Sequence, residues 1–171
     1  MIISTLNSWL PGDARGWRSY RHKRHSSGDY RNPPPPGEHA GLLKYCKDRS
    51  GQPLVIPRSI RATVGKAMID TLIARGHRVL AISVSGQHSH LLVELPDDLT
   101  AIRRIIGDAK SRSSLAIRQQ MPGRVWSARG TYLRIENRRH HVCTFDYILT
   151  QQSEGAWTWS FREEARGEHR L

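Results

Sequence analysis

Two histidines separated by one residue, His88 and His90, lie within an apolar segment of β-forming composition, Val84 to Leu95. Side chains alternate between the two faces of a strand, so both imidazoles are expected on the same face. Imidazole is the commonest protein ligand for transition metals, and two of them on a rigid sheet would supply half of a divalent metal site. A His-x-His pair also occurs on ordinary polar sheet faces, so this interpretation depends on a second element.

The second element is a helix-forming segment near the end of the chain, Arg138 to Gln152. At about 100° per residue its apolar side chains form one buried stripe, made by Val142, Phe145, Ile148 and Leu149. Tyr147 and Gln151 are one turn apart on the opposite side. They would combine a nucleophile with an amide that could bind a metal, although an aromatic residue on a polar helix face is often only a half-exposed tyrosine.

Length and charge limit the classes of protein to consider. The 171 residues suit one domain, residues 1–171, with a real core, because 37% of them are hydrophobic. Lys and Arg number 27 against 15 Asp and Glu, a formal net charge of +12, which indicates a polyanionic partner, most simply nucleic acid. One alternative is a basic surface that faces only solvent. Another is an acidic membrane, but there is no apolar run of spanning length and no signal-peptide pattern. We therefore expect an intracellular protein without a membrane partner.

The segment from Trp17 to Gln52 differs from the rest of the chain because it is basic and rich in proline. It follows an expected first strand within residues 1–10 and cannot bury enough apolar surface to order by itself. We expect a basic insert at about 17–53 with a short helix around Leu42 to Cys46. The insert is either a solvated loop or an arm on nucleic-acid phosphates, and its candidate contacts are Arg21, Lys23 and Arg24.

The middle of the chain predicts the order helix, strand, strand, helix. The first helix spans residues 57–76 with one apolar face, and two strands follow at 78–85 and 88–95, joined by a tight turn. A second helix runs from the Pro-Asp-Asp sequence at 96–98 to about residue 118. Its last turns carry Lys110 and Arg112, which either complement the helix dipole or contact phosphate.

The remaining elements complete a βαββαβ order. Residues 124–135 predict one interrupted strand with an irregularity at Gly130. The helix expected at 138–152, which contains Tyr147, follows it, and an aromatic tail after residue 156 is expected to pack on the core. This order matches the ferredoxin-like α+β fold, an antiparallel sheet with helices on one face. The strand with His88 and His90 is then central or nearly so, and the last helix can cover the other face and bring Tyr147 and Gln151 toward the imidazoles.

The chain resembles the HUH single-tyrosine transposases of bacterial insertion sequences (the 200/605 group) and their REP-associated tyrosine transposase relatives. The resemblance rests on two motifs, Gln87-His88-Ser89-His90-Leu91-Leu92-Val93 and Tyr147-Ile148-Leu149-Thr150-Gln151. It extends from the first expected strand to the final helix and is poorest in the insert. Element order, histidine pair and Tyr-x-x-x-Gln helix agree jointly, which is more specific than any one of them.

The resemblance implies the HUH endonuclease fold and a metal-dependent single-strand DNA endonuclease and strand transferase of the transposase type. It assigns Tyr147 as the nucleophile and His88, His90 and Gln151 as metal ligands. It implies Mg²⁺ or Mn²⁺ as the cofactor, hairpin-containing single-stranded DNA as the partner, and the bacterial cytoplasm, with the nucleoid, as the location. A homodimer is compatible with the resemblance, and Tyr147 could then act within its own subunit or across the dimer.

The motif departs from the family at Ser89, where a hydrophobic residue is usual. Ser89 is expected to face away from the metal, so the change would weaken packing beneath the site rather than remove a ligand. Many REP-associated relatives carry Asn at the position of Gln151, and either amide oxygen could serve as a ligand.

Phosphodiester chemistry suits these residue types. A tyrosine, with a pKa near 10, needs activation and a Lewis acid that stabilises charge on the phosphate. Two histidines and one amide leave coordination positions for phosphate oxygen and water. Mg²⁺ prefers oxygen ligands, so Mn²⁺ should fit at least as well. The product would be a 5′-phosphotyrosine and a free 3′-hydroxyl, and the retained ester would let the same site join strands.

Two alternatives stay open from the sequence. A domesticated, non-cleaving DNA-binding protein would keep the fold and the charge. A zinc hydrolase using His88, His90 and His140 is weaker, because no Glu or Asp stands at a convincing position for a general base. The joint presence of the histidine pair, Tyr147 and Gln151 favours cleavage over binding alone.

Overall fold

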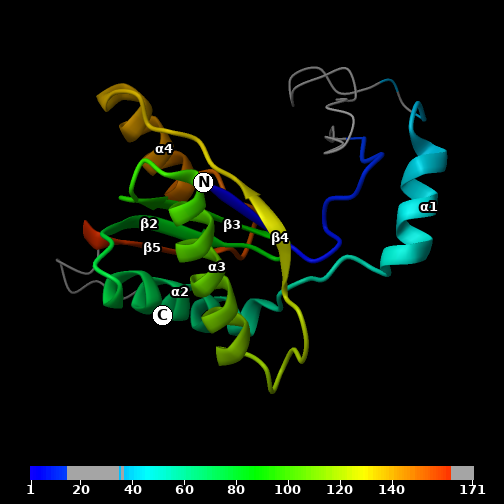
Figure 1. Ribbon diagram of the computed structural model, residues 1–171, viewed down its shortest axis with the longest axis horizontal. Coiled ribbons are helices and arrows are strands. Elements are labelled where there is room, and N and C mark those ends of the chain that lie inside the picture. Colours follow the sequence, from blue (N-terminus) through cyan, green and yellow to red (C-terminus); the bar gives the residue numbers. More distant parts are fainter. Residues whose placement is uncertain (15–34, 36, 163–171) are drawn as a thin grey trace.

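The protein has an α+β fold in which helices lie on both faces of one antiparallel sheet (Figure 1). The computed structural model describes residues 1–14, 35 and 37–162. Five strands lie in the order β4-β1-β3-β2-β5 within this part of the chain. Their bounds are Ile2–Thr5 (β1), Val79–Val84 (β2), His88–Val93 (β3), Trp126–Thr131 (β4) and Trp157–Ser160 (β5). The helices are Ala40–Ser50 (α1), Arg61–Ala74 (α2), Leu99–Ala116 (α3) and Arg138–Thr150 (α4), with a 3-10 turn at Arg58–Ile60.

Strands β2 and β3 form a hairpin at the centre of the sheet, and both are rich in large apolar residues, which suit a pleated, buried surface. Every residue of β2 is buried, and so are the inner residues of β3. Ser85 closes the turn, because its backbone N–H and its hydroxyl both donate to the carbonyl of His88, at 2.9 and 2.8 Å. Strand β1 pairs with the other side of β3, which makes β3 the middle strand.

The larger apolar core lies between the sheet and helices α2 and α3. Its buried helical members are Val64, Met68, Ile69, Leu72, Ile105, Ile106 and Ala109. Helix α2 can approach β5 because residue 65 is a glycine, and a Cβ there would overlap the indole ring of Trp157. Asp98 caps α3 by accepting hydrogen bonds from the backbone N–H groups of Thr100 and Ala101, at 2.9 and 3.2 Å.

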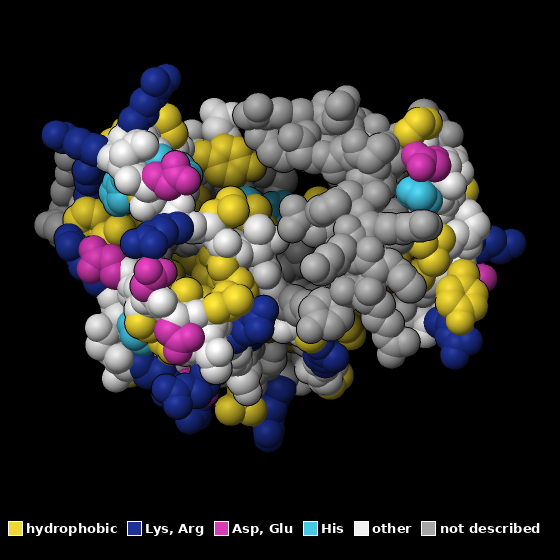
Figure 2. Space-filling view, turned by 45° about the horizontal axis from the view of Figure 1, so that its top comes forward, with side chains coloured by type: hydrophobic (Ala, Val, Ile, Leu, Met, Phe, Trp, Pro, Cys, Tyr) yellow, Lys and Arg dark blue, Asp and Glu magenta, His cyan; other side chains and the backbone are white. Residues whose placement is uncertain are grey.

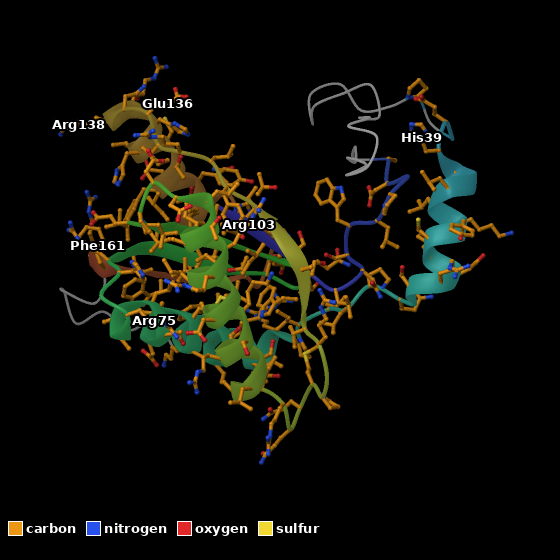
Figure 3. All side chains as sticks on the ribbon, in the orientation of Figure 1. His39, Arg75, Arg103, Glu136, Arg138 and Phe161 are labelled. Carbon is orange, nitrogen blue, oxygen red and sulfur yellow. The ribbon has the colours of Figure 1, made fainter. Side chains whose placement is uncertain are left out.

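Helix α4 packs on the opposite face, over β2, β3 and β5. A smaller apolar cluster holds it there, formed by Leu80, Ala81, Leu92, Phe145 and Ile148. The helix begins after Asn137, whose side-chain oxygen accepts a hydrogen bond from the N–H of His140 at 2.9 Å. Glu136 and Arg138 project outward at this end of the helix (Figure 3).

The two ends of the sheet differ in detail from the expectations. The aromatic tail packs on the core as predicted, but it also forms the edge strand β5, antiparallel to β2. Strand β4 contains Gly130 and ends at Thr131, so residues 132–135 lie beyond the strand, and its pairing with β1 shifts register between Ile3 and Thr5. Residue 130 must be small, because a Cβ there would lie 2.9 Å from the carbonyl oxygen of Ile2.

Helix α1 stands apart from the sheet (Figure 1), and none of its residues is buried. It is longer than the short helix expected around 42–46 and occupies the last part of the 17–53 insert. The side-chain amide of Asn7 donates to the carbonyl of Ser50 and so ties the end of α1 to the segment after β1.

Candidate active site

Strand β3 brings His88 and His90 to the face of the sheet that α4 covers. The two ring centroids are 4.9 Å apart, and the rings are nearly perpendicular, at 87°. His90 is only 7% exposed, and His88 is half-buried. The imidazoles are therefore neighbours on one face, as the alternation of side chains along a strand predicts.

Helix α4 places Tyr147 against this pair. The centroid of its ring is 5.4 Å from that of His90, with an angle of 77° between the rings. Phe145 and Ile148 anchor the helix in the smaller apolar cluster, whereas Tyr147 is 48% exposed. A phenol that contacts a histidine and is still open to solvent can meet a substrate that arrives from outside.

His90 belongs to a row of side chains that crosses the sheet. Residues directly opposite one another in an antiparallel ladder share a face, and His90 is paired with Ile2 on β1 and with Ser83 on β2. Ser83 is paired in turn with Thr158 on β5. The Ser83 hydroxyl is fully buried and has no hydrogen-bond partner among the described residues, which is unusual for a buried polar group. The alternation of β2 is the only sequence signal that could have placed Ser83 beside His90.

Ser89, the residue between the two histidines, faces the opposite side of the sheet, as expected. It is fully buried, and its hydroxyl donates to the carbonyl of Ser83 at 2.6 Å. Its polar group is therefore satisfied away from the imidazoles. Weaker packing beneath the site, expected from a serine at this position, stays a prediction.

Burial controls the charge of His90. The pKa of His90 is lowered to about 4, chiefly by burial and in smaller part by the neighbouring His88 and the amino terminus, which disfavour another positive charge. His90 is therefore neutral at neutral pH, and a neutral imidazole is the form that can bind a metal.

Gln151 lies immediately after the last residue of α4, one turn beyond Tyr147, and is exposed. Its backbone N–H donates to the carbonyl of Tyr147 at 3.1 Å. The next side chain, that of Gln152, donates to the same carbonyl at 2.9 Å and so fixes the turn that carries the tyrosine. Sequence reasoning missed this role of Gln152. Metal binding by Gln151 stays a prediction.

The donor set at this site suits a divalent metal only if other ligands join the imidazoles. Among the described residues, no three His, Cys, Asp or Glu side chains are grouped so that they could hold a metal ion. An amide, water or phosphate oxygen must therefore complete the coordination. His140, which the zinc alternative requires, lies at the start of α4, where its Nδ1 accepts a long hydrogen bond from the N–H of Glu136 at 3.5 Å.

The position of Ser83 would also suit a role in orienting His90 as a metal ligand. Metal-bound histidines usually donate a hydrogen bond from the second ring nitrogen, which fixes the orientation of the ring. The unpaired hydroxyl of Ser83, directly across the ladder from His90, is an acceptor of the required kind. We therefore regard His88 and His90 as suited to hold a divalent ion.

Positive side chains are scattered over the face of the described part shown in Figure 2. In Figure 2, Lys and Arg side chains are spread around its edge with Asp and Glu among them. Of the expected DNA contacts, Arg112 is exposed on α3, whereas Arg21, Lys23 and Arg24 lie outside the described residues. Within the described ranges, no helix has the length and apolar composition needed to cross a bilayer.

Lys110 does not have the placement expected of a phosphate contact. It is 8% exposed, and its Nζ donates to the carbonyl of Ser127 on β4. Burial, with a smaller contribution from Arg124, lowers its pKa. The ammonium group is thus a link between α3 and β4, and we no longer include it among the candidate DNA contacts.

No family model, curated protein or solved structure matches this chain. The function is therefore inferred from the geometry of the site and from the two motifs that form it. Those motifs come from separate parts of the chain, and the fold brings a tyrosine and two histidines from them together.

Proposed function

We propose that this protein is a metal-dependent single-strand DNA endonuclease and strand transferase, similar to the HUH single-tyrosine transposases. The observation that carries the proposal is the contact of Tyr147 with His90, 5.4 Å between ring centroids, beside His88. Phosphodiester cleavage of this kind requires an accessible nucleophile next to side chains that can bind a metal ion. The net charge of +12 suits a nucleic-acid substrate.

The sheet supports the same proposal. From the strand order β4-β1-β3-β2, with α2 and α3 on one face, we infer a ferredoxin-like βαββαβ unit that is extended by β5. Helix α4 lies on the other face and carries the tyrosine. We infer an HUH-type endonuclease fold from this arrangement.

In the proposed reaction, the phenolic oxygen of Tyr147 attacks the phosphorus atom of a single strand, and the bond from phosphorus to the 3′ oxygen breaks. The phenol loses its proton, the 3′ oxygen gains one and leaves as a hydroxyl, and the 5′ side stays attached as a phosphotyrosine. A 3′-hydroxyl can later attack this ester and join the strands. Bound by His88, His90 and the Gln151 amide, Mg²⁺ or Mn²⁺ would supply Lewis-acid stabilisation of the phosphate charge.

Tyr147 is better placed for this attack than Tyr132, the next candidate. Tyr132 follows β4 and is half-buried, and burial raises its pKa although Arg103 acts in the opposite direction. A raised pKa disfavours the phenolate that attacks phosphorus. Tyr147 has the imidazole pair beside it.

The test is a covalent adduct between the protein and labelled, hairpin-flanked single strands in Mn²⁺ or Mg²⁺, resolved on a denaturing gel. Wild type should form the adduct, Tyr147→Phe should not, and Tyr132→Phe is the matched control that should keep it. His88→Ala and His90→Ala should lose both the adduct and calorimetric Mn²⁺ binding, whereas His140→Ala should lose much less. An adduct that persists in Tyr147→Phe would move the nucleophile elsewhere.

The competing function is a DNA-binding protein of the same fold that does not cleave. The basic surface would serve it equally well, so binding measurements alone do not separate the two. DNA binding without any adduct in wild type, at saturating Mn²⁺ and on several hairpin-flanked strands, would favour this alternative.

A further inference from the structure

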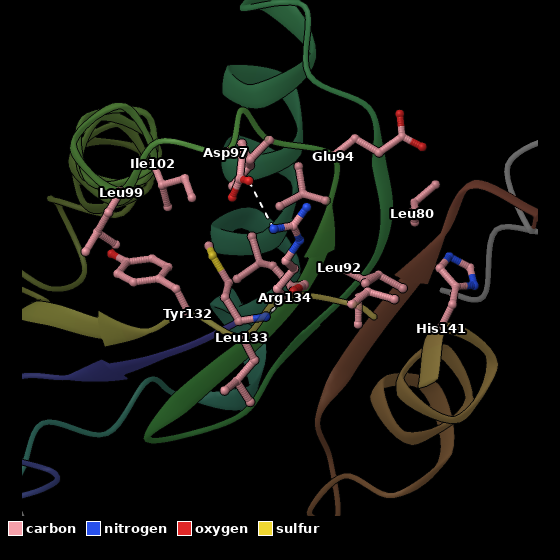
Figure 4. A pocket seen from close by; sticks show the side chains of 15 residues that line it. Leu80, Leu92, Glu94, Asp97, Leu99, Ile102, Tyr132, Leu133, Arg134 and His141 are labelled. Atoms are coloured by element: carbon pink, nitrogen blue, oxygen red, sulfur yellow. Dashed lines mark hydrogen bonds and ion pairs between the residues drawn. The ribbon is translucent and has the colours of Figure 1, made fainter. Parts of the chain in front are cut away.

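A pocket of about 430 Å³ lies at the end of β3 that is remote from the β2–β3 turn (Figure 4). Most of the side chains that line it are apolar, among them Leu80, Leu91, Leu92, Val93 and Ile102. Its sides come from the segment that follows β4, the start of α3 and the start of α4. A largely apolar hollow of this size, with a few polar groups at its rim, is the usual form of a site for a small ligand.

The rim carries groups that suit a flat heteroaromatic ring. Asp97 and Arg134 form an ion pair of 3.1 Å, dashed in Figure 4, and both side chains are mostly exposed. The ring of His141 lies at the α4 end of the hollow, and the ring of Tyr132 lies at its other end, near Leu99 and Ile102 (Figure 4). The ion pair presents hydrogen-bond donors and acceptors together, as the edge of a nucleobase requires, and the rings offer surfaces for stacking.

Two of the elements that line the pocket, α4 and β3, also carry the proposed catalytic residues. His141 is on the same helix as Tyr147, six residues earlier, which is about 9 Å along the axis at ~1.5 Å per residue. Leu92 in the lining is two residues beyond His90 on the same face of β3. At ~3.4 Å per stacked nucleotide, and more when the strand is extended, a base in the pocket would be roughly one to three nucleotides from a phosphate at Tyr147.

Guanidinium groups around the pocket suit the phosphates of a nucleotide chain, although the lining itself has the carboxylates of Glu94 and Asp97 beside Arg134. Arg134 is at the rim itself, and Arg103 lines a neighbouring hollow that shares Tyr132 and Leu99 with the pocket. Arg138 projects from the start of α4 (Figure 3). Arg103 and Arg138 can bind the phosphates on either side of an inserted base, whereas Arg134 is paired with Asp97.

We propose that this pocket binds one unpaired nucleobase of the single strand close to the cleaved phosphate and thereby gives the protein a base preference. The inference rests on the proposed function and adds the element that selects its substrate. The base inserts over Leu92, stacks on the ring of His141, and pairs its edge with Asp97 and Arg134. A base held in a duplex cannot enter, because it is stacked and paired with its partner strand.

The test compares single strands of about twelve nucleotides, within the usual range of site sizes, with abasic strands that carry the same number of phosphates. Binding is measured by fluorescence anisotropy with Tyr147→Phe protein, so no cleavage occurs. The ratio of the two affinities cancels the contribution of phosphate charge. In the parent protein the strand with bases should bind about tenfold tighter than the abasic strand.

Two variants localise this advantage to the pocket. Leu133→Glu places a carboxylate at the rim, and Arg134→Ala removes the hydrogen-bond donors of the guanidinium group. Both variants should bring the ratio of the affinities for the strand with bases and for the abasic strand close to one. Leu115→Glu on α3 is the matched control, because Leu115 is also an exposed leucine, and this variant should keep the ratio. Circular dichroism checks that each variant is folded. A ratio that is the same in all four proteins would overturn the pocket assignment.

The outcome is separable from that of the proposed function. The binding ratio needs neither metal nor cleavage, whereas the proposed function fails if wild type forms no adduct. Where cleavage occurs, replacing single bases next to the cleaved phosphate should change its rate in wild type and leave the rate of Leu133→Glu unchanged. A rate in Leu133→Glu that is as base-dependent as in wild type would also overturn the pocket assignment.

Discussion

Two serines on neighbouring strands show how single side chains set the properties of the site. The hydroxyl of Ser89 donates to the carbonyl of Ser83, whereas the hydroxyl of Ser83 has no partner within the described residues. A buried hydroxyl without a partner costs about 1–3 kcal/mol. That cost is recovered if a metal takes one ring nitrogen of His90 and the other donates its proton to Ser83. Ser83 is then a positioning residue whose contribution appears only when the metal is bound.

We expect Ser83→Ala to bind Mn²⁺ about tenfold more weakly, because His90 loses the acceptor that orients its ring. The same variant should keep its stability or gain up to about 1 kcal/mol, because an unpaired buried hydroxyl has been removed. Ser89→Ala is the control and should show the reverse, a loss of about 1 kcal/mol with unchanged Mn²⁺ affinity. Calorimetric titration and urea unfolding measure the two quantities. Equal Mn²⁺ affinity in Ser83→Ala and wild type would remove Ser83 from the site.

The pKa of His90 predicts how stability depends on pH in protein stripped of metal by a chelator. The folded-state pKa is about 4 and the ordinary value is 6.5, so between these values only the unfolded chain binds the proton. The free energy of unfolding is therefore unaffected by this histidine above pH 6.5. It decreases as the pH drops from 6.5 toward 4, by roughly 3 kcal/mol in total, because protonation of His90 favours the unfolded chain. Urea unfolding at several pH values should show this decline in wild type and a smaller one in His90→Gln. Identical pH profiles would contradict the burial of this imidazole.

At the level of elements, periodicity alone predicted the helices and strands that build the site. The alternation around His88 and His90 placed both rings on one face, and the apolar stripe of α4 placed Tyr147 outside the buried core, although Val142, expected in that stripe, is exposed. Strand β5 was missed because four residues are too few to show alternation, and its pairing with β2 depends on an edge left free elsewhere in the fold. The pocket lined by Leu92 could not be predicted, since segments far apart in the sequence enclose it.

The packing of α2 against β5 depends on one glycine, and this gives a prediction at the same level. Gly65→Ala should lose about 1–3 kcal/mol of stability, because its methyl group would overlap the ring of Trp157 and force the helix or the strand to shift. Gly107→Ala on α3 is the matched control, because nothing lies near a Cβ there. It should gain roughly 0.5–1 kcal/mol through its better helix propensity. Urea unfolding measures both, and a Gly65→Ala protein as stable as wild type would show that the Trp157 ring is free to move.

For the whole molecule, composition predicted a polyanionic partner, but it could not say which positive groups are available to bind one. Lys110 and Arg112 are two residues apart on the same helix, yet the first is buried against β4 and the second is exposed. The difference arises because the long stem of Lys110 lies in the helix–sheet interface and its ammonium group finds the carbonyl of Ser127. Sequence spacing alone does not show which basic side chains face outward, because that depends on how α3 is rotated against the sheet.

The salt dependence of single-strand binding tests this distinction. The logarithm of affinity should fall with the logarithm of salt concentration by about 0.7 for each phosphate that the protein neutralises. Arg112→Gln should flatten the slope by about that amount without altering any preference for a hairpin over a plain strand, because phosphate contacts position the substrate but do not specify it. Lys110→Met should leave the slope unchanged, because its ammonium already binds Ser127. If both variants flatten the slope equally, Lys110 leaves the interface between α3 and β4 when DNA binds. If the wild type binds duplex and hairpin with equal affinity at every salt concentration, a general DNA-binding protein is favoured.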